Sequence, residues 1–550
     1  MISRSNESLS ELKVIFIIIV FSLAIYLGLM TPGLFSTDEN ANLYLSRSIA
    51  EGFSLEVDSY FIGRRIDERL AIPPSFSINK EHIYAAVEIG YPLMSSPFYR
   101  IFGLMGLQIS NAIITSLTLV LLYYGSLKIW GNREAGFLSV LLYLFGTYSL
   151  FHSTSLWHHA LVTLGFLGAQ VSWLYFDENA KNPGLFLLSS VIALLAAFYL
   201  LLPIGILFLY VLKKKRNGLI VPIFLATLLA IFWYNLQVSP SIMGQHSLNF
   251  GFSFSTVINN FIGMVIYRGY LIDRWGRWII QKSILESSPF LVTSFFGLFY
   301  MRKKSLIFPN LIYLLSILLY TSPDFGGKIF SMRYLLPILP FMTLLSAGFM
   351  TKFYKNYRFW VLPLLILTGY SYLHSPTIAI RSLEYMKIKA LSLSLAIALS
   401  IFCLVHIQMK SRVTSFLLVL MFIGAFAFSN FLNVHELKVG NLERSYQIRS
   451  HNTLGDLTNE GDVVIVPKFS PWDRAVIDDR VMFYYPNPTE GYEDRGMIIN
   501  DLIEKSVVRK KSIHLVFWVG DKEIKKLALN LNSNVFPIDN YYHIITLENH

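Results

Sequence analysis

The chain has 550 residues, of which 54% are hydrophobic and only 15% are charged. Ordinary soluble domains carry about 25% charged residues, and they could not hide so many apolar side chains from water. The composition therefore excludes a soluble multidomain protein, a disordered chain, a coiled coil and a collagen, and it leaves a polytopic membrane protein. The single cysteine, Cys403, excludes a disulfide framework and a multi-cysteine metal site.

The net charge of +11 is explained by membrane topology rather than by nucleic-acid binding. Short basic runs stand at the ends of hydrophobic stretches, at 213–216 and 302–304. Basic residues gather in the cytoplasmic loops of membrane proteins. A nucleic-acid-binding module would instead present a basic face interleaved with aromatic residues. We therefore expect a lipid bilayer, and no nucleic acid, as a partner.

The first apolar run, Val14 to Met30, is long enough to span a bilayer, and no signal-peptidase pattern follows it, so we predict a retained helix. A polar stretch, Thr31–Tyr99, comes next, within a large first outer loop at 31–106. The remaining apolar spans are 107–127, 134–152, 157–175, 184–198, 199–212, 219–238, 288–301, 305–321, 333–351, 359–374, 388–407 and 413–432. Together they predict about thirteen transmembrane helices, with Pro203 as the break that divides 184–212 into two.

The distribution of basic residues orients these spans. With the N-terminus in the cytoplasm, nearly every inner loop carries Lys or Arg, as the positive-inside rule requires. A single helix over 184–212 would invert all later loops and move the basic runs outside. We therefore predict a multi-pass protein of the plasma (cytoplasmic) membrane, with its N-terminus inside. The polar regions 31–99, 239–287 and 321–332, and the tail after 432, then lie outside.

The tail differs in composition from the rest of the chain. Short apolar runs at 463–466, 481–484 and 513–518 are bounded by Gly, Pro or Asp, which is typical of buried strands. The segments 497–510 and 522–531 have helical spacing. The sequence therefore predicts a multi-spanning membrane domain at 1–435 and a small α/β extracytoplasmic domain at 440–550.

Two adjacent acids, Asp38 and Glu39, follow closely on the first membrane helix. Thr37 can cap a helix whose first turn holds both acids, and in the simplest interpretation they only complement the helix dipole. Their position supports a second interpretation. A carboxylate at the junction of outer loop and bilayer can reach a substrate whose lipid lies in the membrane and whose head group lies outside.

This Asp-Glu pair, followed by Tyr44, Ala50 and Glu51-Gly52, resembles the GT-C class of glycosyltransferases, in particular the group of protein O-mannosyltransferases and lipid A aminoarabinose transferases. Further segments resemble that family in the same order and on the same predicted side of the membrane. They are Ile89-Gly90-Tyr91-Pro92-Leu93, His159-Ala160-Leu161, Tyr267-Arg268-Gly269-Tyr270 with Ser288-Pro289, and Gly326-Gly327 with Arg333-Tyr334-Leu335-Leu336-Pro337. The order of these matches, rather than any one of them, carries the resemblance.

The resemblance implies that a sugar moves, with inversion, from a polyprenyl-phosphate donor to a lipid, glycan or protein acceptor on the outer face of the membrane. In such enzymes a carboxylate base takes the acceptor proton, and we assign this role to Asp38, with Glu39 as the second choice. The leaving lipid phosphate needs cationic partners. We expect Arg333, Arg268 and Lys328 there, since planar Arg grips phosphate oxygens with two hydrogen bonds.

The matched segments add three candidate substrate contacts, namely Glu88, Tyr91 and His159. Two departures from the family pattern limit what the resemblance implies. Met332 stands where Pro is usual, and the second outer loop, 152–159, lacks the acid of some members. We therefore assign no metal ligand and name no cofactor. A divalent cation remains an open possibility as the cofactor.

Three other functions stay open. A polysaccharide polymerase or ligase is also polytopic and uses lipid-linked substrates. We expect its functional acids and arginines on later outer loops, however. A non-catalytic relative of the GT-C class is compatible with the departure at Met332. A secondary transporter would carry charges in mid-span and internal repeats, and the small number of charges in these spans disfavours it.

Overall fold

The structure of the chain is a computed structural model. It describes residues 2–60, 75–79, 81–179, 183–214, 220–238, 253–267, 271–272, 278–279, 282–319, 333–353, 358–375, 382–459, 461–467, 481–485, 499–500, 503, 512–518, 521–522, 524–526, 535–538 and 542–547.

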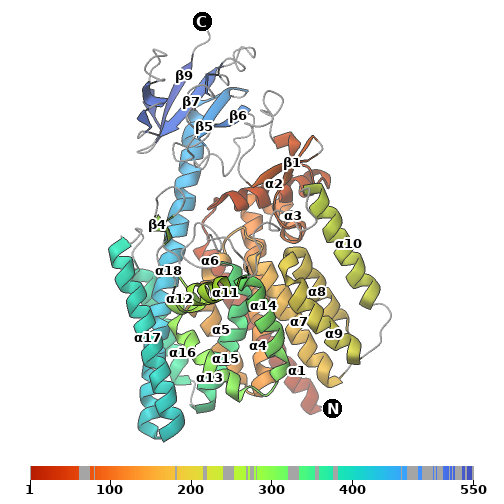
Figure 1. Ribbon diagram of the computed structural model, residues 1–550, viewed down its shortest axis with the longest axis vertical. Coiled ribbons are helices and arrows are strands. Elements are labelled where there is room, and N and C mark those ends of the chain that lie inside the picture. Colours follow the sequence, from red (N-terminus) through yellow and green to blue (C-terminus); the bar gives the residue numbers. More distant parts are fainter. Residues whose placement is uncertain are drawn as a thin grey trace.

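Apolar helices make up most of the molecule (Figure 1). They follow the long apolar runs of the sequence, because a helix satisfies its own backbone hydrogen bonds where water is absent. The helices of the bundle are α1 (Ile2–Leu29), α4 (Leu104–Trp130), α5 (Arg133–Gly146), α6 (Ser149–His152), α7 (His159–Asn179), α8 (Gly184–Ala196), α9 (Leu201–Lys214), α10 (Ile220–Val238), α11 (Phe254–Phe261), α12 (Ile284–Ser287), α13 (Thr293–Tyr300), α14 (Ile307–Leu318), α15 (Leu339–Phe353), α16 (Arg358–His374), α17 (Ser382–Met409) and α18 (Arg412–Leu457).

A helical element lies within each of the spans predicted from the sequence. Within the described ranges, six helices are long and apolar enough to cross a bilayer, and five shorter apolar helices accompany them. The predominantly helical fold class is therefore confirmed. The number of membrane crossings stays a prediction.

The stretch 184–212 is divided into two helices close to the predicted boundary between 198 and 199, and Pro203 is not the residue that divides it. α8 ends at Ala196, and Ala197 has extended backbone angles (φ −162°, ψ 113°) before a 3-10 turn leads into α9. Pro203 lies in the first turn of α9, where its missing N–H costs no intrahelical bond. The break therefore occurs at Ala197 rather than at Pro203.

The first polar region folds into a layer over one end of the bundle (Figure 1). It contains α2 (Thr37–Gly52), the 3-10 turn η1 (Asp58–Tyr60), the antiparallel hairpin of β1 (Phe76–Asn79) and β2 (His82–Ala85), and α3 (Gly90–Phe102). We call this end the α2 end of the bundle. The N-terminus of α1 lies at the opposite end.

Helix α18 has 46 residues, so it is about 70 Å long. It leaves the bundle at the α2 end and leads to a five-stranded sheet in the order β6-β5-β7-β9-β8 (Figure 1). The strands are β5 (Val463–Pro467), β6 (Val481–Tyr485), β7 (Ile513–Trp518), β8 (Val535–Pro537) and β9 (Tyr542–Leu547). β5 is parallel to β6 and β7, whereas β9 is antiparallel to β7 and β8.

Strands therefore stand at 463–466, 481–484 and 513–518, where the apolar runs predicted them. The helices expected at 497–510 and 522–531 lie mostly outside the described residues. The assignment of a small α/β domain, and the boundaries of both domains, stay predictions.

Two buried ion pairs join the last helices to the chain around α12. Lys282 Nζ lies 3.0 Å from Glu436 Oε2 on α18, and Lys389 Nζ on α17 lies 3.2 Å from Glu286 Oε1. No side chain of the four is more than 3% exposed. A buried charge without its partner is strongly unfavourable, so both pairs hold α17 and α18 in a defined register against α12.

The predicted orientation can be tested with single cysteines. We expect Asn452→Cys, at the exposed far end of α18, to react with a membrane-impermeant thiol reagent in intact cells, since the tail is predicted to lie outside. Lys304→Cys, in the basic loop before α14, should react only after lysis. The native Cys403 is buried and gives little background. If the Lys304 variant and not the Asn452 variant were labelled in intact cells, the orientation would be opposite to the predicted one.

Candidate functional site

The Asp-Glu pair lies in the first turn of α2. Ser36 is the N-cap of this helix, with extended backbone angles, and its hydroxyl accepts a hydrogen bond from Glu39 N at 3.3 Å. Thr37, which the sequence suggested as the cap, is the first helical residue instead. Asp38 and Glu39 therefore stand beside the positive end of the helix dipole, where carboxylates are favoured.

The Asp38 carboxylate forms an ion pair with Arg333. The distance between Arg333 Nη2 and Asp38 Oδ2 is 2.7 Å, and the Ser75 hydroxyl donates to Asp38 Oδ1 at 3.0 Å. The Asp38 side chain keeps 36% of its surface exposed, although it is closely surrounded by protein, and Arg333 keeps 12%. The pair is therefore accessible from solvent on the Asp38 side.

Burial raises the pKa of the Asp38 carboxyl, but the charge and hydrogen bond of Arg333 and the hydrogen bond from Ser75 lower it. The balance holds the pKa below its ordinary value of 3.8. Asp38 is therefore an ionised carboxylate at neutral pH, with a cation directly beside it.

Arg333 opens the 3-10 helix η8 (Arg333–Ile338), which leads into α15. Its guanidinium carbon lies 5.0 Å from the ring centroid of Trp157 and 5.5 Å from that of Tyr334. The indole N–H of Trp157 donates to the Ser36 hydroxyl at 2.9 Å, which ties this ring to the cap of α2. The aromatic faces hold the guanidinium by cation–π attraction and leave its edge for hydrogen bonds.

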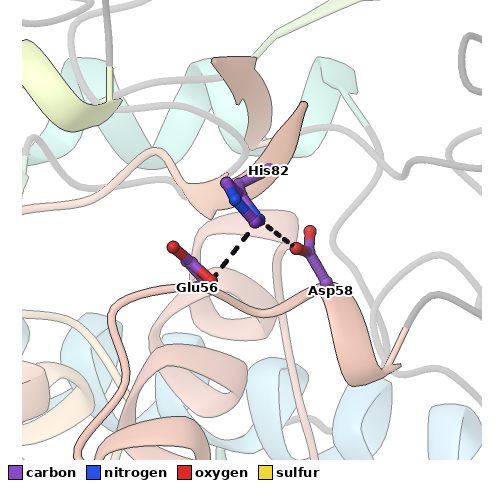
Figure 2. A group of neighbouring side chains, drawn as sticks. All are labelled: Glu56, Asp58 and His82. Carbon is purple, nitrogen blue, oxygen red and sulfur yellow. Dashed lines mark hydrogen bonds and ion pairs between the residues drawn. The ribbon is translucent and has the colours of Figure 1, made fainter. Parts of the chain in front are cut away.

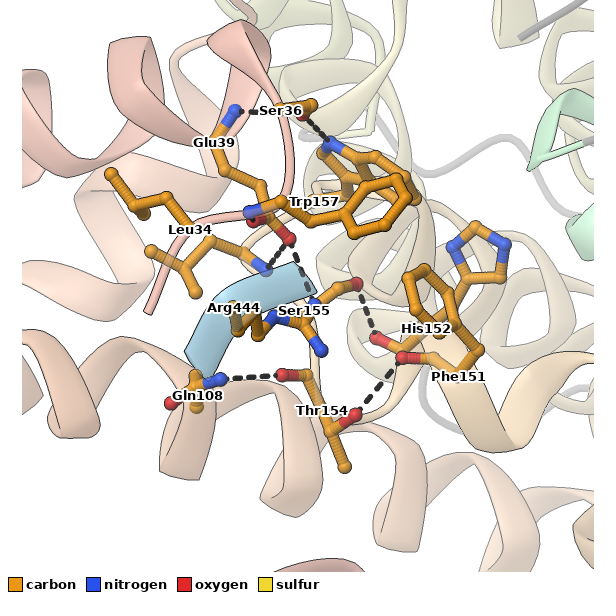
Figure 3. A network of polar contacts seen from close by, with 12 residues as sticks. Leu34, Ser36, Glu39, Gln108, Phe151, His152, Thr154, Ser155, Trp157 and Arg444 are labelled. Carbon is orange, nitrogen blue, oxygen red and sulfur yellow. Dashed lines mark hydrogen bonds and ion pairs between the residues drawn. The ribbon is translucent and has the colours of Figure 1, made fainter. Parts of the chain in front are cut away.

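Glu39 is fully buried, and its side chain points toward Arg444 (Figure 3). Its Oε1 atom lies 3.2 Å from Arg444 Nη2 and accepts the backbone N–H of Leu156 at 2.9 Å. Its Oε2 atom accepts the backbone N–H of Phe35. Arg444 is fully buried too. Glu39 thus joins three segments that are far apart in the sequence.

One face of α18 holds the linker between α1 and α2. Asn441 Nδ2 donates to the last carbonyl of α1 at 2.9 Å, and Leu34 N donates to Gln447 Oε1 at 3.2 Å. Arg444 lies between these two side chains, since residues three apart share a helix face. Gly33 has a left-handed φ of 122°, and a Cβ there would lie 2.9 Å from the Arg444 carbonyl oxygen. Only glycine permits this close crossing.

Buried amides hold the opposite side of the site, the segment between α6 and α7 (Figure 3). Gln108 Nε2 donates to the carbonyls of Thr31 and Thr154, at 2.9 Å in each case. Asn111, on the same face of α4, donates to two further carbonyls of that segment. The backbone that meets Glu39 is therefore fixed by α4 as well as by α18.

Two of the other predicted contacts lie near one another. Glu88 Oε2 is 3.4 Å from His158 Nδ1. The ring of His158 packs at 4.1 Å from that of His159, which in turn lies edge-on to Tyr334 at 5.2 Å. Through Tyr334, His159 adjoins the aromatic surroundings of Arg333.

Tyr91 occupies a different place. It is fully buried, and its hydroxyl donates to the Leu107 carbonyl at 2.8 Å, so it joins α3 to α4. Gly90, the first residue of α3, passes the end of α8 so closely that a Cβ would lie 2.6 Å from the backbone of Leu195. The Gly-Tyr-Pro segment thus positions α3 in the layer. Arg268 and Lys328, the other expected phosphate contacts, lie outside the described residues.

Sequence reasoning missed three residues of this site, namely Ser75, Trp157 and Arg444. Each meets the start of α2 from a distant part of the chain, and no local pattern singles it out. Arg444 lies about three turns of helix after the last predicted span, and a basic residue beyond the end of a membrane span is ordinary. The only usable signal would have been its position in a helix that continues well past the membrane.

The arrangement combines a partly exposed carboxylate, a guanidinium with aromatic support and a rigid frame behind both. A carboxylate in such a place can accept a proton, and an Arg edge can bind an anionic oxygen. The two groups now neutralise one another, so an anionic ligand that reached Arg333 would compete with Asp38 for it.

No protein-family profile matches the chain, and no curated protein sequence matches it. Solved structures do. The crystal structure of ArnT from Cupriavidus metallidurans bound to undecaprenyl phosphate aligns with a TM-score of 0.56 and 11% identity, over 98% of this chain and 98% of that one. Its apo state gives the same score and identity over 100% and 99%. The archaeal oligosaccharyltransferase AglB from Archaeoglobus fulgidus aligns with a TM-score of 0.44 and 10% identity, over 91% and 69%.

At this identity the likeness to ArnT shows a shared fold, and it extends over the whole of both chains. The chain therefore has the GT-C fold that its sequence resembled, and it is a multi-pass membrane protein. The score for AglB is too low to add to this argument.

The buried Glu39–Arg444 pair yields a stability prediction. Arg444→Ala leaves a buried carboxylate without its cation, which costs about 3–5 kcal/mol. We expect a clearly lower midpoint of thermal unfolding for the purified protein in detergent. The control is Arg449→Ala, which removes an exposed Arg from the same helix and should change stability by less than about 0.5 kcal/mol. Equal midpoints for the two variants would mean that Glu39 does not depend on Arg444.

Proposed function

We propose that this protein is a membrane glycosyltransferase that moves a sugar from a polyprenyl-phosphate donor to an acceptor hydroxyl at the α2 end of the bundle, on the outer face of the membrane. The observation that carries the proposal is the Asp38–Arg333 pair, with the two groups 2.7 Å apart and exposed on one side. A transfer of this kind needs a base for the acceptor and a cation for the leaving phosphate, and the pair supplies both.

Asp38 is the proposed general base. It accepts the proton of the acceptor O–H as that oxygen bonds to the anomeric carbon. The bond between the anomeric carbon and the phosphate oxygen breaks on the opposite face, and the polyprenyl phosphate leaves with the electron pair. One displacement inverts the anomeric configuration. A positioned base contributes about 10²–10⁴ in rate.

Arg333 is the proposed partner of the lipid phosphate. When the donor binds, its phosphate oxygens replace the Asp38 carboxylate on the guanidinium edge, because charge-assisted bonds from Arg to phosphate are bidentate and strong. Asp38 then loses the cation that lowers its pKa and becomes a better proton acceptor. Donor binding would therefore activate the base.

Trp157 and Tyr334 are the proposed positioning residues. Their rings lie against the guanidinium, and Trp157 is fixed by its bond to the cap of α2. Glu39 plays no chemical part in this scheme, since it is buried and already accepts hydrogen bonds from two backbone groups and Arg444. It orients the first turn of α2 so that Asp38 faces Arg333.

The fold supports the choice of donor. ArnT, whose fold this chain shares over nearly its full length, has been crystallised with undecaprenyl phosphate. We carry that ligand class to this chain because Arg333 is a cation suited to a lipid phosphate. The sugar and the acceptor are left open, as lipid, glycan or protein.

Replacing Asp38 with Asn tests the base. The change keeps the shape of the side chain but removes its ability to take a proton, so we expect a rate loss of about 10²-fold or more. The purified protein is supplied with polyprenyl-phosphate sugars and host membranes as the acceptor source, and mass spectrometry follows the release of polyprenyl phosphate. Asp456→Asn, at the exposed end of α18, makes the same change of charge and should leave turnover unaltered. Normal turnover in the Asp38 variant would favour a polymerase-like or non-catalytic role.

Replacing Arg333 with Ala tests the phosphate partner. Charged hydrogen bonds of this kind contribute about 1.5–3 kcal/mol, so undecaprenyl phosphate should bind roughly 10- to 150-fold more weakly. Lys at 333 should restore only part of the affinity, because it keeps the charge and loses the fork. Unchanged binding in the Ala variant would mean that Arg333 does not contact the lipid phosphate and is only a basic residue at the end of a membrane span.

The same variant should move the acid limb of the profile of kcat/KM against pH, which reports the enzyme before the donor binds. In the wild type the pKa of Asp38 is depressed, so the base stays ionised until the pH falls below its ordinary value of 3.8. The stability contributed by the ion pair is likewise present above that pH and is lost as the pH falls through the depressed pKa. Without Arg333, burial alone raises the pKa, and the limb should shift to higher pH. A limb that does not move would place the titrating base elsewhere.

A further inference from the structure

Three potential metal ligands, none of them part of the Asp38–Arg333 pair, converge in the layer over the α2 end (Figure 2). Glu56 comes from the segment that joins α2 to η1, Asp58 is the first residue of η1, and His82 is the first residue of β2. All three side chains are partly accessible, with exposed fractions of 43%, 32% and 46% in that order. A solvated ion can therefore reach them.

Backbone pairing brings these residues together. Glu56 forms a bridge with Tyr84 next to β2, and Val57 N donates to the carbonyl of Ile83 at 3.0 Å. In an extended segment alternate side chains point to opposite faces. Val57 is therefore fully buried, while its neighbours Glu56 and Asp58 share the other face with His82.

The distances suit a bound ion. His82 Nδ1 lies 3.4 Å from Glu56 Oε2 and 2.6 Å from Asp58 Oδ2, and the three ligand atoms all lie within 4.8 Å of one another. Two ligands that are each about 2.1 Å from a tetrahedral metal are roughly 3.4 Å apart. The His82–Glu56 distance matches this value, and the His82–Asp58 hydrogen bond needs to open by less than about 1 Å.

We propose that Glu56, Asp58 and His82 bind a divalent transition-metal ion of the zinc class. One neutral imidazole and two carboxylates form a donor set with a charge of −2, which favours a dication. Imidazole nitrogen suits zinc and its neighbours, whereas magnesium and calcium prefer oxygen ligands alone. The other oxygen of Asp58 accepts the N–H of Ile83 at 2.6 Å, and such an outer contact orients a ligand carboxylate.

A polar cavity of about 360 Å³ adjoins the cluster and leaves room for water ligands. It is lined by Ser48, Glu51, Gly52, Ser54, Glu56, Asp58, Ser59 and Tyr60. Glu51, the third acid there, is already engaged, since it accepts from Arg47 Nε at 2.9 Å and from the Tyr60 hydroxyl at 2.8 Å. The metal would thus have three protein ligands and an open side that faces water, without recruiting Glu51.

The ion would fasten the hairpin to the segment after α2. Ser75, directly before β1, donates to Asp38 through the same hairpin, so the clamp would also steady the outer support of the proposed base. The inference itself does not rest on the proposed function, because it concerns binding of the metal and the stability that follows.

The test is metal binding by the purified full-length protein in detergent. After treatment with a chelator, the protein is titrated with ZnCl2, and bound metal and the midpoint of thermal unfolding are measured. We expect one zinc ion per chain from this site and a raised midpoint, since a ligand that binds only the folded state stabilises it. His82→Ala should weaken zinc binding by at least about tenfold.

Glu56→Gln is a second variant. Its side chain is partly exposed and Gln keeps its shape, so the protein should fold, and this change too should weaken zinc binding. His374→Ala removes an exposed His at the end of α16 and is the matched control, with binding expected to stay at the wild-type level. No stoichiometric zinc binding, or equal affinity in the His82 and His374 variants, would overturn the proposal and leave a simple hydrogen-bonded triad. MgCl2 binding as tight as ZnCl2 binding would overturn the role of the imidazole.

Discussion

The fully buried ion pair between Glu39 and Arg444 is the contact on which the rest of the site depends. Taking both charges out of water is costly, and their attraction offsets that cost only when the geometry is good and the remaining polar atoms are satisfied. The Glu39 carboxylate meets this condition with two backbone N–H groups, from Phe35 and Leu156. The pair is therefore a constraint more than a source of stability, because each partner excludes most other positions for the other.

That constraint determines where Asp38 points. Successive residues of a helix are about 100° apart around its axis, so once Glu39 is held toward α18, Asp38 must face another direction. That direction is the start of η8, where Arg333 lies on Trp157. The proposed base and its cation thus meet because an adjacent acid, which takes no part in the chemistry, is locked in the core.

The length of α18 connects this constraint to the tail. The same helix forms a buried pair with Lys282 through Glu436, contacts the α1–α2 linker through Asn441 and Gln447, and then leads to the sheet (Figure 1). The C-terminal part of the chain is therefore joined by one rigid element to the first turn of α2. A change at the sheet that shifted α18 would therefore move Arg444, and through the ion pair with Glu39 it would also move Asp38.

The periodicity and composition of the sequence were enough to predict the membrane class of the protein, the positions of the apolar helices and three strands of the tail. These depend on runs of apolar residues whose burial is decided locally. The position of Asp38 and Glu39 after the first membrane helix singled out both acids, and the resemblance to the GT-C class added Arg333. In the structure both acids lie in the first turn of α2, and Arg333, from η8, lies against Asp38. The break at Ala197 and the cap at Ser36 differed from expectation by a few residues, since several nearby residues could serve equally well.

Only the tertiary structure decided which acid is buried and which is exposed, because the two are adjacent and chemically alike. The difference comes from Arg444, 405 residues further along the chain than Glu39, and from the loop that presents Leu156. Glu56 and Asp58 likewise meet His82 because the backbone pairs across the first polar region, and no sequence motif relates the three residues. The local sequence determines the chemistry that a residue is capable of. The partner of that residue is determined by packing between segments that are distant in the sequence and that no short pattern relates.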